Sequence, residues 1–114
     1  MNIEELRDFC LSLPGTTESM KWGHLCFLIE EKIYVIIDFE GEGDFCVKCN
    51  PEEFDELIAQ PGFLQAPHMA KRQWVLGKGI ANFPEDLIKR LLQNSRILVI
   101  GKMSKKLQAK YLNG

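Results

Sequence analysis

The chain has 114 residues and a net charge of −2, with 46% hydrophobic and 26% charged residues, as is ordinary for a soluble globular protein. This length is sufficient for a single domain (1–114) that buries a core without disulfides. The N-terminal stretch MNIEELRDF lacks the basic and apolar regions of a signal peptide, and no apolar window is long enough to span a bilayer. We therefore expect a cytoplasmic protein with no membrane partner and with reduced cysteines.

The first expected element is a helix. Asn2 and Glu5 form a capping box, and apolar residues then recur at helical spacing until Leu-Pro-Gly at 13–15 ends the helix. The polar stretch that follows, 15–23, is expected to be a loop. Three strands are expected after it, at 25–30, 33–39 and 44–49. The connections between them, one of them at Glu31-Lys32, are short enough to require antiparallel pairing.

The second half of the chain begins with a strong helix start at Asn50, Pro51 and Glu53. A loop and a fourth strand at 71–77 come next. Pro84 opens the last helix, whose wide apolar stripe continues to a break at Gly101 or Ser104. The order α–β–β–β–α–β–α predicts an α+β fold in which one antiparallel sheet is covered on one face by helices.

The cysteines provide the first candidate for chemistry, because Cys46 and Cys49 form a Cys-x-x-Cys motif. Positions i and i+3 of a strand point to opposite faces, so we predict that these thiols form neither a disulfide nor a metal site. His24 and Cys26 share a strand face and are an alternative second pair of metal ligands, but the same divergence opposes closure. A dyad of Cys26 with His68 is a further alternative that nothing in the sequence favours.

Two other patterns are interpreted as structural. The pairs Gly41-x-Gly43 and Gly77-x-Gly79 lack the third glycine of a phosphate-binding fingerprint and are expected to be turns. Acidic residues gather at the predicted hairpin ends without the spacing of a calcium loop. We therefore predict no catalytic residues, no cofactor and no metal site.

The distribution of charge is the strongest remaining signal. Residues 1–60 contain four Lys/Arg and fourteen Asp/Glu, a net −10, whereas residues 61–114 contain ten and two, a net +8. Such asymmetry indicates either a surface for a polyanion or two halves that pack together and neutralise each other. Basic residues near an aromatic favour binding to phosphates. The candidate DNA-binding residues are Lys71, Arg72, Trp74, Lys78, Lys89 and Arg96.

Trp74 has two interpretations in this set. It alternates with Val75 along the fourth strand, so one of the two side chains faces outward. We expect Trp74 to pack against the helix layer, because an aromatic of this size stabilises a small core strongly. If the indole faces outward instead, it is available to stack on a base.

Several short motifs together resemble the MmcQ/YjbR family of small bacterial proteins over nearly the full length. They are LPGT at 13–16, KWG at 21–23, FLIEEKIYVI at 27–36, VKCNPEEF at 47–54, HMAKRQWV at 68–75 and NSRILVIGKMSKK at 94–106. The resemblance implies a frataxin-like fold, also described as a double-wing DNA-binding fold. The chain departs from the family pattern in having Arg96 where an aromatic usually follows the serine, Ser95, and in its slightly acidic balance.

The leading hypothesis is a non-enzymatic protein that binds DNA weakly through backbone phosphates, because no element has the features of a base-reading recognition helix. The alternative is a protein-interaction or small-ligand module whose basic half meets an acidic partner. An enzyme is the third hypothesis. One continuous positive patch on the surface would favour DNA, and interleaved signs would disfavour it.

Overall fold

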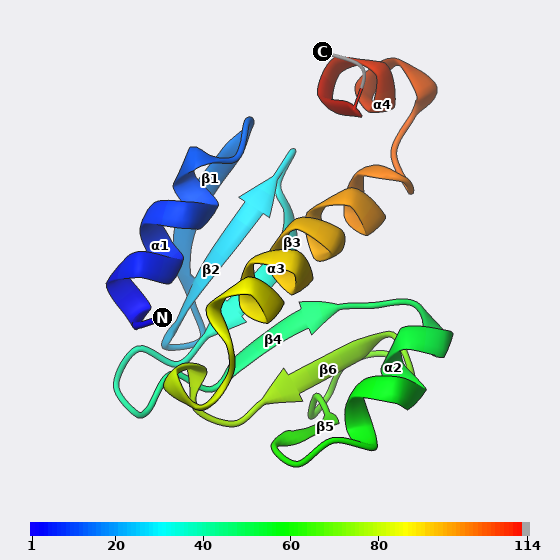
Figure 1. Cartoon of the computed structure of the whole chain (residues 1–114). Coiled ribbons are helices and arrows are strands. Elements are labelled where there is room, and N and C mark those ends of the chain that lie inside the picture. Colours follow the sequence, from blue (N-terminus) through cyan, green and yellow to red (C-terminus); the bar gives the residue numbers. More distant parts are fainter. Residues whose placement is uncertain (113–114) are drawn as a thin grey trace.

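A computed structural model describes residues 1–112, which form one six-stranded sheet with helices packed against it (Figure 1). The elements are α1 (Ile3–Ser12), β1 (Thr16–Lys21), β2 (His24–Ile29), β3 (Lys32–Ile37), β4 (Phe45–Lys48), α2 (Pro51–Ile58), β5 (Phe63–Gln65), β6 (Trp74–Gly77), the 3-10 helix η1 (Ile80–Asn82), α3 (Glu85–Ile100) and α4 (Lys105–Leu112). None of the helices in residues 1–112 is long and apolar enough to cross a membrane.

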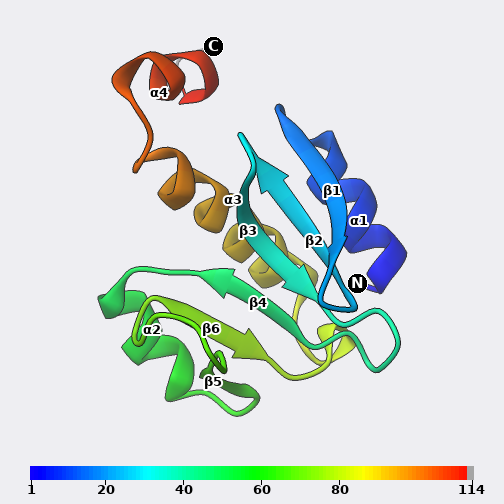
Figure 2. The same cartoon turned by 180° about the vertical axis from the view of Figure 1, so that it is seen from behind.

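The strands pair in the order β1-β2-β3-β4-β6-β5, and every pair is antiparallel. Helices α1 and α3 lie in front of the sheet in Figure 1, and α2 contacts β5 and β6. Seen from behind, in Figure 2, the strands face the viewer with no helix over them. This arrangement confirms the predicted α+β fold with helices on one face, and it leaves the other face uncovered.

Two strands were not predicted, and β1 is the larger of them. Residues 16–21 pair with β2 along their whole length, from Thr16 opposite Ile29 to Lys21 opposite His24. The prediction of a loop was wrong because this edge strand is polar and mostly exposed, so its sequence has no apolar alternation. The second strand, β5, has only three residues and is too short to form a recognisable pattern.

The turns that join the first three strands use two residues each. Trp22 and Gly23 have φ of 53° and 77°, and Glu30 and Glu31 have φ of 48° and 63°. Positive φ at both positions is the geometry of a type I′ turn, which matches the twist of paired strands. The second turn therefore lies at Glu30-Glu31, one residue earlier than the predicted Glu31-Lys32.

The core lies between the sheet and the helices. Alternate strand residues such as Val47 and Val75 point into it, together with the apolar stripe of α3. Phe45 packs edge-on against Phe63 and Phe83, with ring centroids 6.5 and 5.8 Å away. A Cβ at Gly77 would lie 2.5 Å from the Phe45 ring, so the absence of a side chain at this position allows β6 and the ring to approach.

The strands β3 and β4 pair over only three residues each and then diverge, as Figure 1 shows. Ser95 of α3 is completely buried at this gap. Its hydroxyl donates to the carbonyl oxygen of Tyr34 at 2.6 Å and accepts from the backbone N–H of Lys48 at 2.8 Å. One side-chain hydroxyl thus satisfies the two backbone groups that the divergence leaves without a ladder partner.

Candidate ligand-binding site

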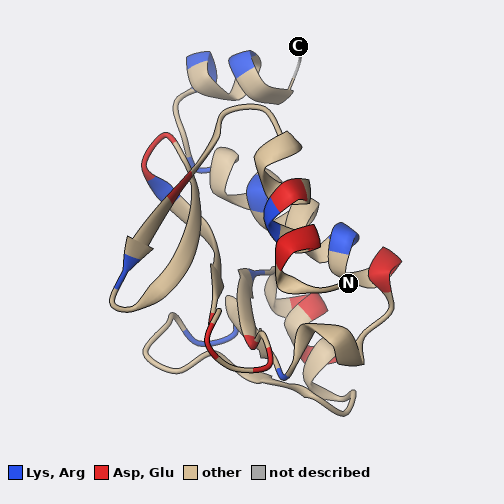
Figure 3. Cartoon of the chain, turned by 90° about the vertical axis from the view of Figure 1, so that its left-hand side faces the viewer, with Lys and Arg blue, Asp and Glu red and all other residues tan. Residues whose placement is uncertain are grey.

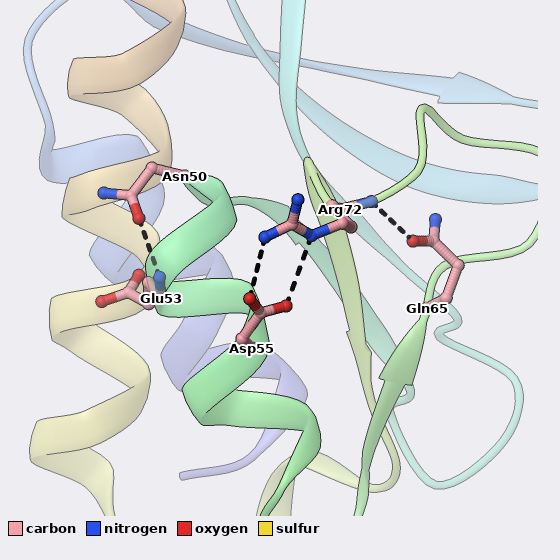
Figure 4. A network of polar contacts seen from close by, with 5 residues as sticks. All are labelled: Asn50, Glu53, Asp55, Gln65 and Arg72. Carbon is pink, nitrogen blue, oxygen red and sulfur yellow. Dashed lines mark hydrogen bonds and ion pairs between the residues drawn. The ribbon is translucent and has the colours of Figure 1, made fainter.

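The predicted basic residues are spread over several elements. Lys71 and Arg72 are exposed in the turn before β6. The Arg72 guanidinium donates to both carboxylate oxygens of Asp55 on α2, at 2.8 and 3.4 Å, and its backbone N–H donates to the side chain of Gln65 at 3.0 Å (Figure 4). The hydrogen bond to Asp55 raises the pKa of Arg72 above its ordinary value. Arg72 therefore joins this turn to α2 and β5, and Asp55 neutralises its charge.

The other predicted lysines also lie beside carboxylates. The Lys78 ammonium lies 3.7 Å from Asp44, and the Lys89 ammonium lies 3.6 Å from Glu85 on the same helix. Lys89 also lies over the ring of Phe9 at 5.6 Å, on the helix side of the molecule. Lys78, by contrast, follows β6. Lys78 and Lys89 therefore lie on different parts of the molecule and do not form one continuous basic surface.

Arg96 is 8% exposed, and this placement does not fit the phosphate contact that the sequence predicted for it. Its guanidinium donates to the carbonyl oxygen of Pro14 at 2.6 Å and lies over the ring of Tyr111, which in turn donates to the carboxylate of Glu30. The apolar stripe of α3 turns this residue inward, and the peptide carbonyl and the aromatic ring then take the place of water. Arg96 joins α3 to α4 and to the end of α1.

Trp74 is buried at 9% exposure. Val75 occupies the core position between the sheet and the helices, paired with Val47. The period of two thus places Trp74 on the opposite side of β6, with Leu76, and its approach to the helix layer is limited to the end of α3. At the start of β6 the indole reaches the gap between β3 and β4, where it lies near Val99 and Met103.

Figure 3 shows Lys and Arg positions close to Asp and Glu positions on neighbouring elements. Six ion pairs form among residues 1–112, and four of them join a cation of residues 61–114 to an acid of residues 1–60. These four pairs are Arg72–Asp55, Lys78–Asp44, Arg90–Glu53 and Lys110–Glu30. The two halves of the chain therefore pack together and neutralise each other, which was the alternative interpretation of the charge asymmetry.

A hollow with a volume of about 590 Å³ lies instead on the uncovered face of the sheet. We call it the uncovered-face pocket. Its lining residues are Trp22, His24, Ile36, Asp38, Asp44, Cys46, Pro67, His68, Met69 and Leu76. The volume lies within the range of small-molecule sites, about 300–1,000 Å³.

The pocket is built by the sheet and by two projections from it. Ile36, Cys46 and Leu76 are aligned across β3, β4 and β6 and form its floor. One wall is Trp22 at the tip of the β1–β2 turn, where the indole is 79% exposed. The opposite wall is the segment 67–69 before β6. Both walls contain non-glycine residues with positive φ, at Trp22 and at His68.

The polar groups of the pocket include both histidines of the chain, two carboxylates and one thiol. Asp38 accepts a hydrogen bond from the backbone of Glu40 at 3.1 Å, and Asp44 accepts one from the backbone of Gly79 at 2.9 Å. Burial, followed by the nearby charge of Asp44, raises the pKa of the Cys46 thiol to about 11. The thiol is therefore protonated near neutral pH and is a poor nucleophile.

The two cysteines of the Cys-x-x-Cys motif lie on opposite faces, as their spacing predicted. Cys46 lines the uncovered-face pocket, whereas Cys49 belongs to the core on the helix side. Cys26 is also buried, and its sulfur lies 3.9 Å from the carbonyl oxygen of His24. Within residues 1–112 no three His, Cys, Asp or Glu side chains come together as metal ligands.

The sequence did not predict this pocket. Its floor comes from β3, β4 and β6, the last of which is separated from β4 along the chain by α2 and β5, and its walls come from a turn and a loop. One signal was nevertheless present at Trp22-Gly23, where a large aromatic residue takes a turn position that normally favours Asn. Once residues 16–21 are recognised as a strand, that exposed tryptophan stands at the tip of a hairpin.

Comparison with known proteins gives one family and related structures. The YjbR family model matches residues 11–98. A crystal structure of a Deinococcus radiodurans protein with a DUF419 domain has a TM-score of 0.88 and 25% identity, over 96% of this chain and 87% of that one. A crystal structure of a Pseudomonas syringae protein has a TM-score of 0.70 and 20% identity, over 83% and 96%. A search of curated proteins gives no match.

Proposed function

The chain belongs to the YjbR family, and on this premise we propose that it is a non-enzymatic binding protein whose uncovered-face pocket holds a small ligand. The observation that supports this proposal is the pocket itself, a hollow of about 590 Å³ on a sheet face that no helix covers. A sheet face in a protein of this size is normally covered or polar, whereas this one presents Ile36, Leu76 and an exposed indole.

The chemistry of the lining defines the class of ligand. Trp22, Met69 and Leu76 offer contacts to an apolar or aromatic body. The carboxylates of Asp38 and Asp44 lie at one end, and no lysine or arginine lines the pocket. Asp44 already lies beside the Lys78 ammonium, at 3.7 Å, whereas Asp38 forms no ion pair within residues 1–112. We therefore assign the pocket to a small amine with an aromatic or branched aliphatic group, because a cation complements the Asp38 carboxylate.

The polar groups support binding rather than catalysis. The only thiol in the pocket is protonated near neutral pH, because burial raises the pKa of Cys46. A nucleophile would need an adjacent base to activate it, and neither His24 nor His68 has a hydrogen bond to Cys46 within residues 1–112. These features favour a site that recognises its ligand and leaves it unchanged.

An NMR titration of the ¹⁵N-labelled chain with phenethylamine tests this proposal. The expected result is a set of saturable shifts confined to the backbone amides of the pocket and the Trp22 indole N–H. Leu76→Arg places a cation on the pocket floor and is expected to abolish these shifts. Leu64→Arg is the matched control, because Leu64 pairs with Leu76 across β5 and β6 but does not line the pocket.

Two results would contradict the proposal. One is shifts that spread evenly over the protein, which would show that the amine has no defined site. The other is a Leu76→Arg variant that binds as well as Leu64→Arg, which would place the amine elsewhere. An uncharged analogue, ethylbenzene, separates the two parts of recognition, since weaker binding than phenethylamine is expected if Asp38 and Asp44 contribute.

Weak, non-specific DNA binding is a second candidate, favoured by the exposure of Lys71, Arg72 and Lys78 around β6. Three phosphate contacts would give a slope of log affinity against log salt of about −2.7, with dissociation constants of about 10⁻⁴–10⁻⁶ M or weaker. The carboxylates of Asp55 and Asp44 compete with phosphate for two of these cations. Trp74 supports the strand in this proposal and does not stack on a base.

Fluorescence anisotropy with random and A·T-rich duplexes at two salt concentrations tests the DNA candidate. Replacing Lys71, Arg72 and Lys78 together with Ala should weaken binding to both duplexes alike, because phosphate contacts contain no base information. Asp55→Asn is the informative counterpart, since it should free Arg72 and strengthen binding. Absence of binding at low salt would exclude the DNA candidate without affecting the small-ligand proposal.

A further inference from the structure

Three lysine side chains surround a second, smaller hollow of about 210 Å³ at the gap between β3 and β4. We call it the lysine pocket. Its lining residues are Lys32, Lys48 and Lys102 together with Ile33, Trp74, Val99 and Met103. It shares no lining residue with the uncovered-face pocket, and none of its lining residues is acidic.

The fold brings these lysines together from distant parts of the chain. Lys32 begins β3, Lys48 ends β4 and Lys102 follows the end of α3. The gap exists because the β3–β4 pairing stops at Val35 and Val47. The Ser95 hydroxyl then holds the backbone N–H of Lys48, which fixes the position of that residue at the edge of the gap.

The positive charge of the lysine pocket is not neutralised by the protein. Arg72, Lys78 and Lys110 each lie beside a carboxylate, but none of the lysine-pocket cations forms an ion pair within residues 1–112. Burial and the nearby charge of Lys102 lower the pKa of Lys48. Two ammonium groups thus repel each other at a partly buried position, and a bound anion would relieve that repulsion.

We propose that the lysine pocket binds a phosphate group. Lysine ammonium groups act as point-charge donors to phosphate, and three of them match the charge of a multivalent anion. The volume is below the range of drug-sized ligands, about 300–1,000 Å³, so a compact anion fits and a bulky organic body does not. The apolar contacts of Trp74, Val99 and Met103 limit the water that competes with the anion.

An NMR titration of the chain with pyrophosphate at low ionic strength tests this site. The expected shifts fall on the amides of Lys48 and Lys102 and on the Trp74 indole, and not on the uncovered-face pocket. The double variant Lys48→Gln/Lys102→Gln should bind pyrophosphate at least about tenfold more weakly, because two charge-assisted contacts are lost. The matched control is Lys71→Gln/Lys78→Gln, which removes the same charge outside the pocket.

Equal weakening in the two double variants would overturn the proposal, since net charge alone would then explain the binding. Lys32→Gln/Lys102→Gln changes two exposed lysines only and provides the same test if the Lys48 variant does not fold. A short duplex added to the pyrophosphate complex identifies the source of the phosphate. Displacement from Lys48 and Lys102 indicates a nucleic-acid backbone, and no displacement indicates a small phosphate ester.

Discussion

The two faces of the sheet are made by the same strands, but helices cover one face and leave the other uncovered. On the face covered by α1 and α3, alternate residues such as Phe45 and Val75 are fully buried in one continuous core. On the uncovered face, their neighbours Cys46 and Leu76 line a pocket. A shift of one position along a strand therefore separates a residue that stabilises the fold from one that is available to a ligand.

This difference indicates where mutations should act. Substitutions on the covered face should lower the free energy of unfolding, and substitutions on the uncovered face should change binding with little effect on stability. Residues at the gap between β3 and β4 belong to neither face. Their substitutions test whether effects on stability and effects on binding are separate.

The largest effect is expected for Phe45→Ala. The ring is fully buried and packs edge-on against Phe63 and Phe83, so its removal leaves a cavity in the core. We expect the free energy of unfolding to fall by about 3–5 kcal/mol, measured by urea denaturation. The control on the uncovered face is Leu64→Ala, which should cost about 0.5 kcal/mol or less because this side chain is already exposed.

Trp74→Ala tests whether the contribution of a side chain to the free energy of unfolding depends on its burial or on the face of the sheet to which it belongs. Trp74 is on the uncovered side of β6, yet it is almost as buried as the core residues. We expect a loss of about 3–5 kcal/mol in the free energy of unfolding, as for other buried large aromatics. A loss below about 1 kcal/mol would show that the indole does not stabilise the fold, and stacking on a ligand or base would then be its better explanation.

The sequence predicted the covered face better than the uncovered one, for a physical reason. Core-facing positions such as Val47 repeat with period two, and those of α3 repeat with period 3.6, so local pattern is sufficient to place them. The polar edge strand β1 has no such pattern, because its stability comes from backbone pairing with β2. The side of β6 that Trp74 takes was hard to predict for a related reason, since size favours burial but does not specify the face.

The candidate site could not be predicted well, because it depends on contacts between residues that are far apart along the chain. Arg72 and Lys78 were identified as basic residues, but their partners Asp55 and Asp44 lie far away along the chain. Arg96 lies on the inward side of α3, where its buried guanidinium contacts the carbonyl oxygen of Pro14 and the ring of Tyr111, and neither contact can be read from the helix itself. Interleaved signs were considered from the sequence as an alternative, and folding of the two halves against each other produces them.

Ser95→Ala examines the junction between the two faces. The substitution removes the hydroxyl that bonds to the backbone of both Tyr34 and Lys48, and it leaves these buried groups unsatisfied. We expect a loss of about 1–3 kcal/mol in the free energy of unfolding. Ser12→Ala is the control, because Ser12 is exposed and bonds only to the carbonyl of Phe9. Equal stability of the two variants would mean that water replaces the Ser95 hydroxyl.

Trp22→Asn is expected to change stability least. It should also separate stability from binding most clearly. Trp22 occupies the first position of a type I′ turn at φ 53°, where Asn is favoured and a bulky residue is strained. Asn should therefore raise the free energy of unfolding slightly, by up to about 1 kcal/mol. The same change removes one wall of the uncovered-face pocket, so the affinity for phenethylamine should fall while stability rises.

Glu31→Gly is the matched control for this opposition between stability and binding. Glu31 has a similar φ of 63° in the other two-residue turn, and it does not line the uncovered-face pocket. Its substitution should relieve backbone strain without changing the affinity for phenethylamine. If Trp22→Asn leaves that affinity unchanged as well, the tryptophan is not part of the binding site. If it weakens binding while stabilising the fold, the local strain at Trp22 is explained by the ligand rather than by the sheet.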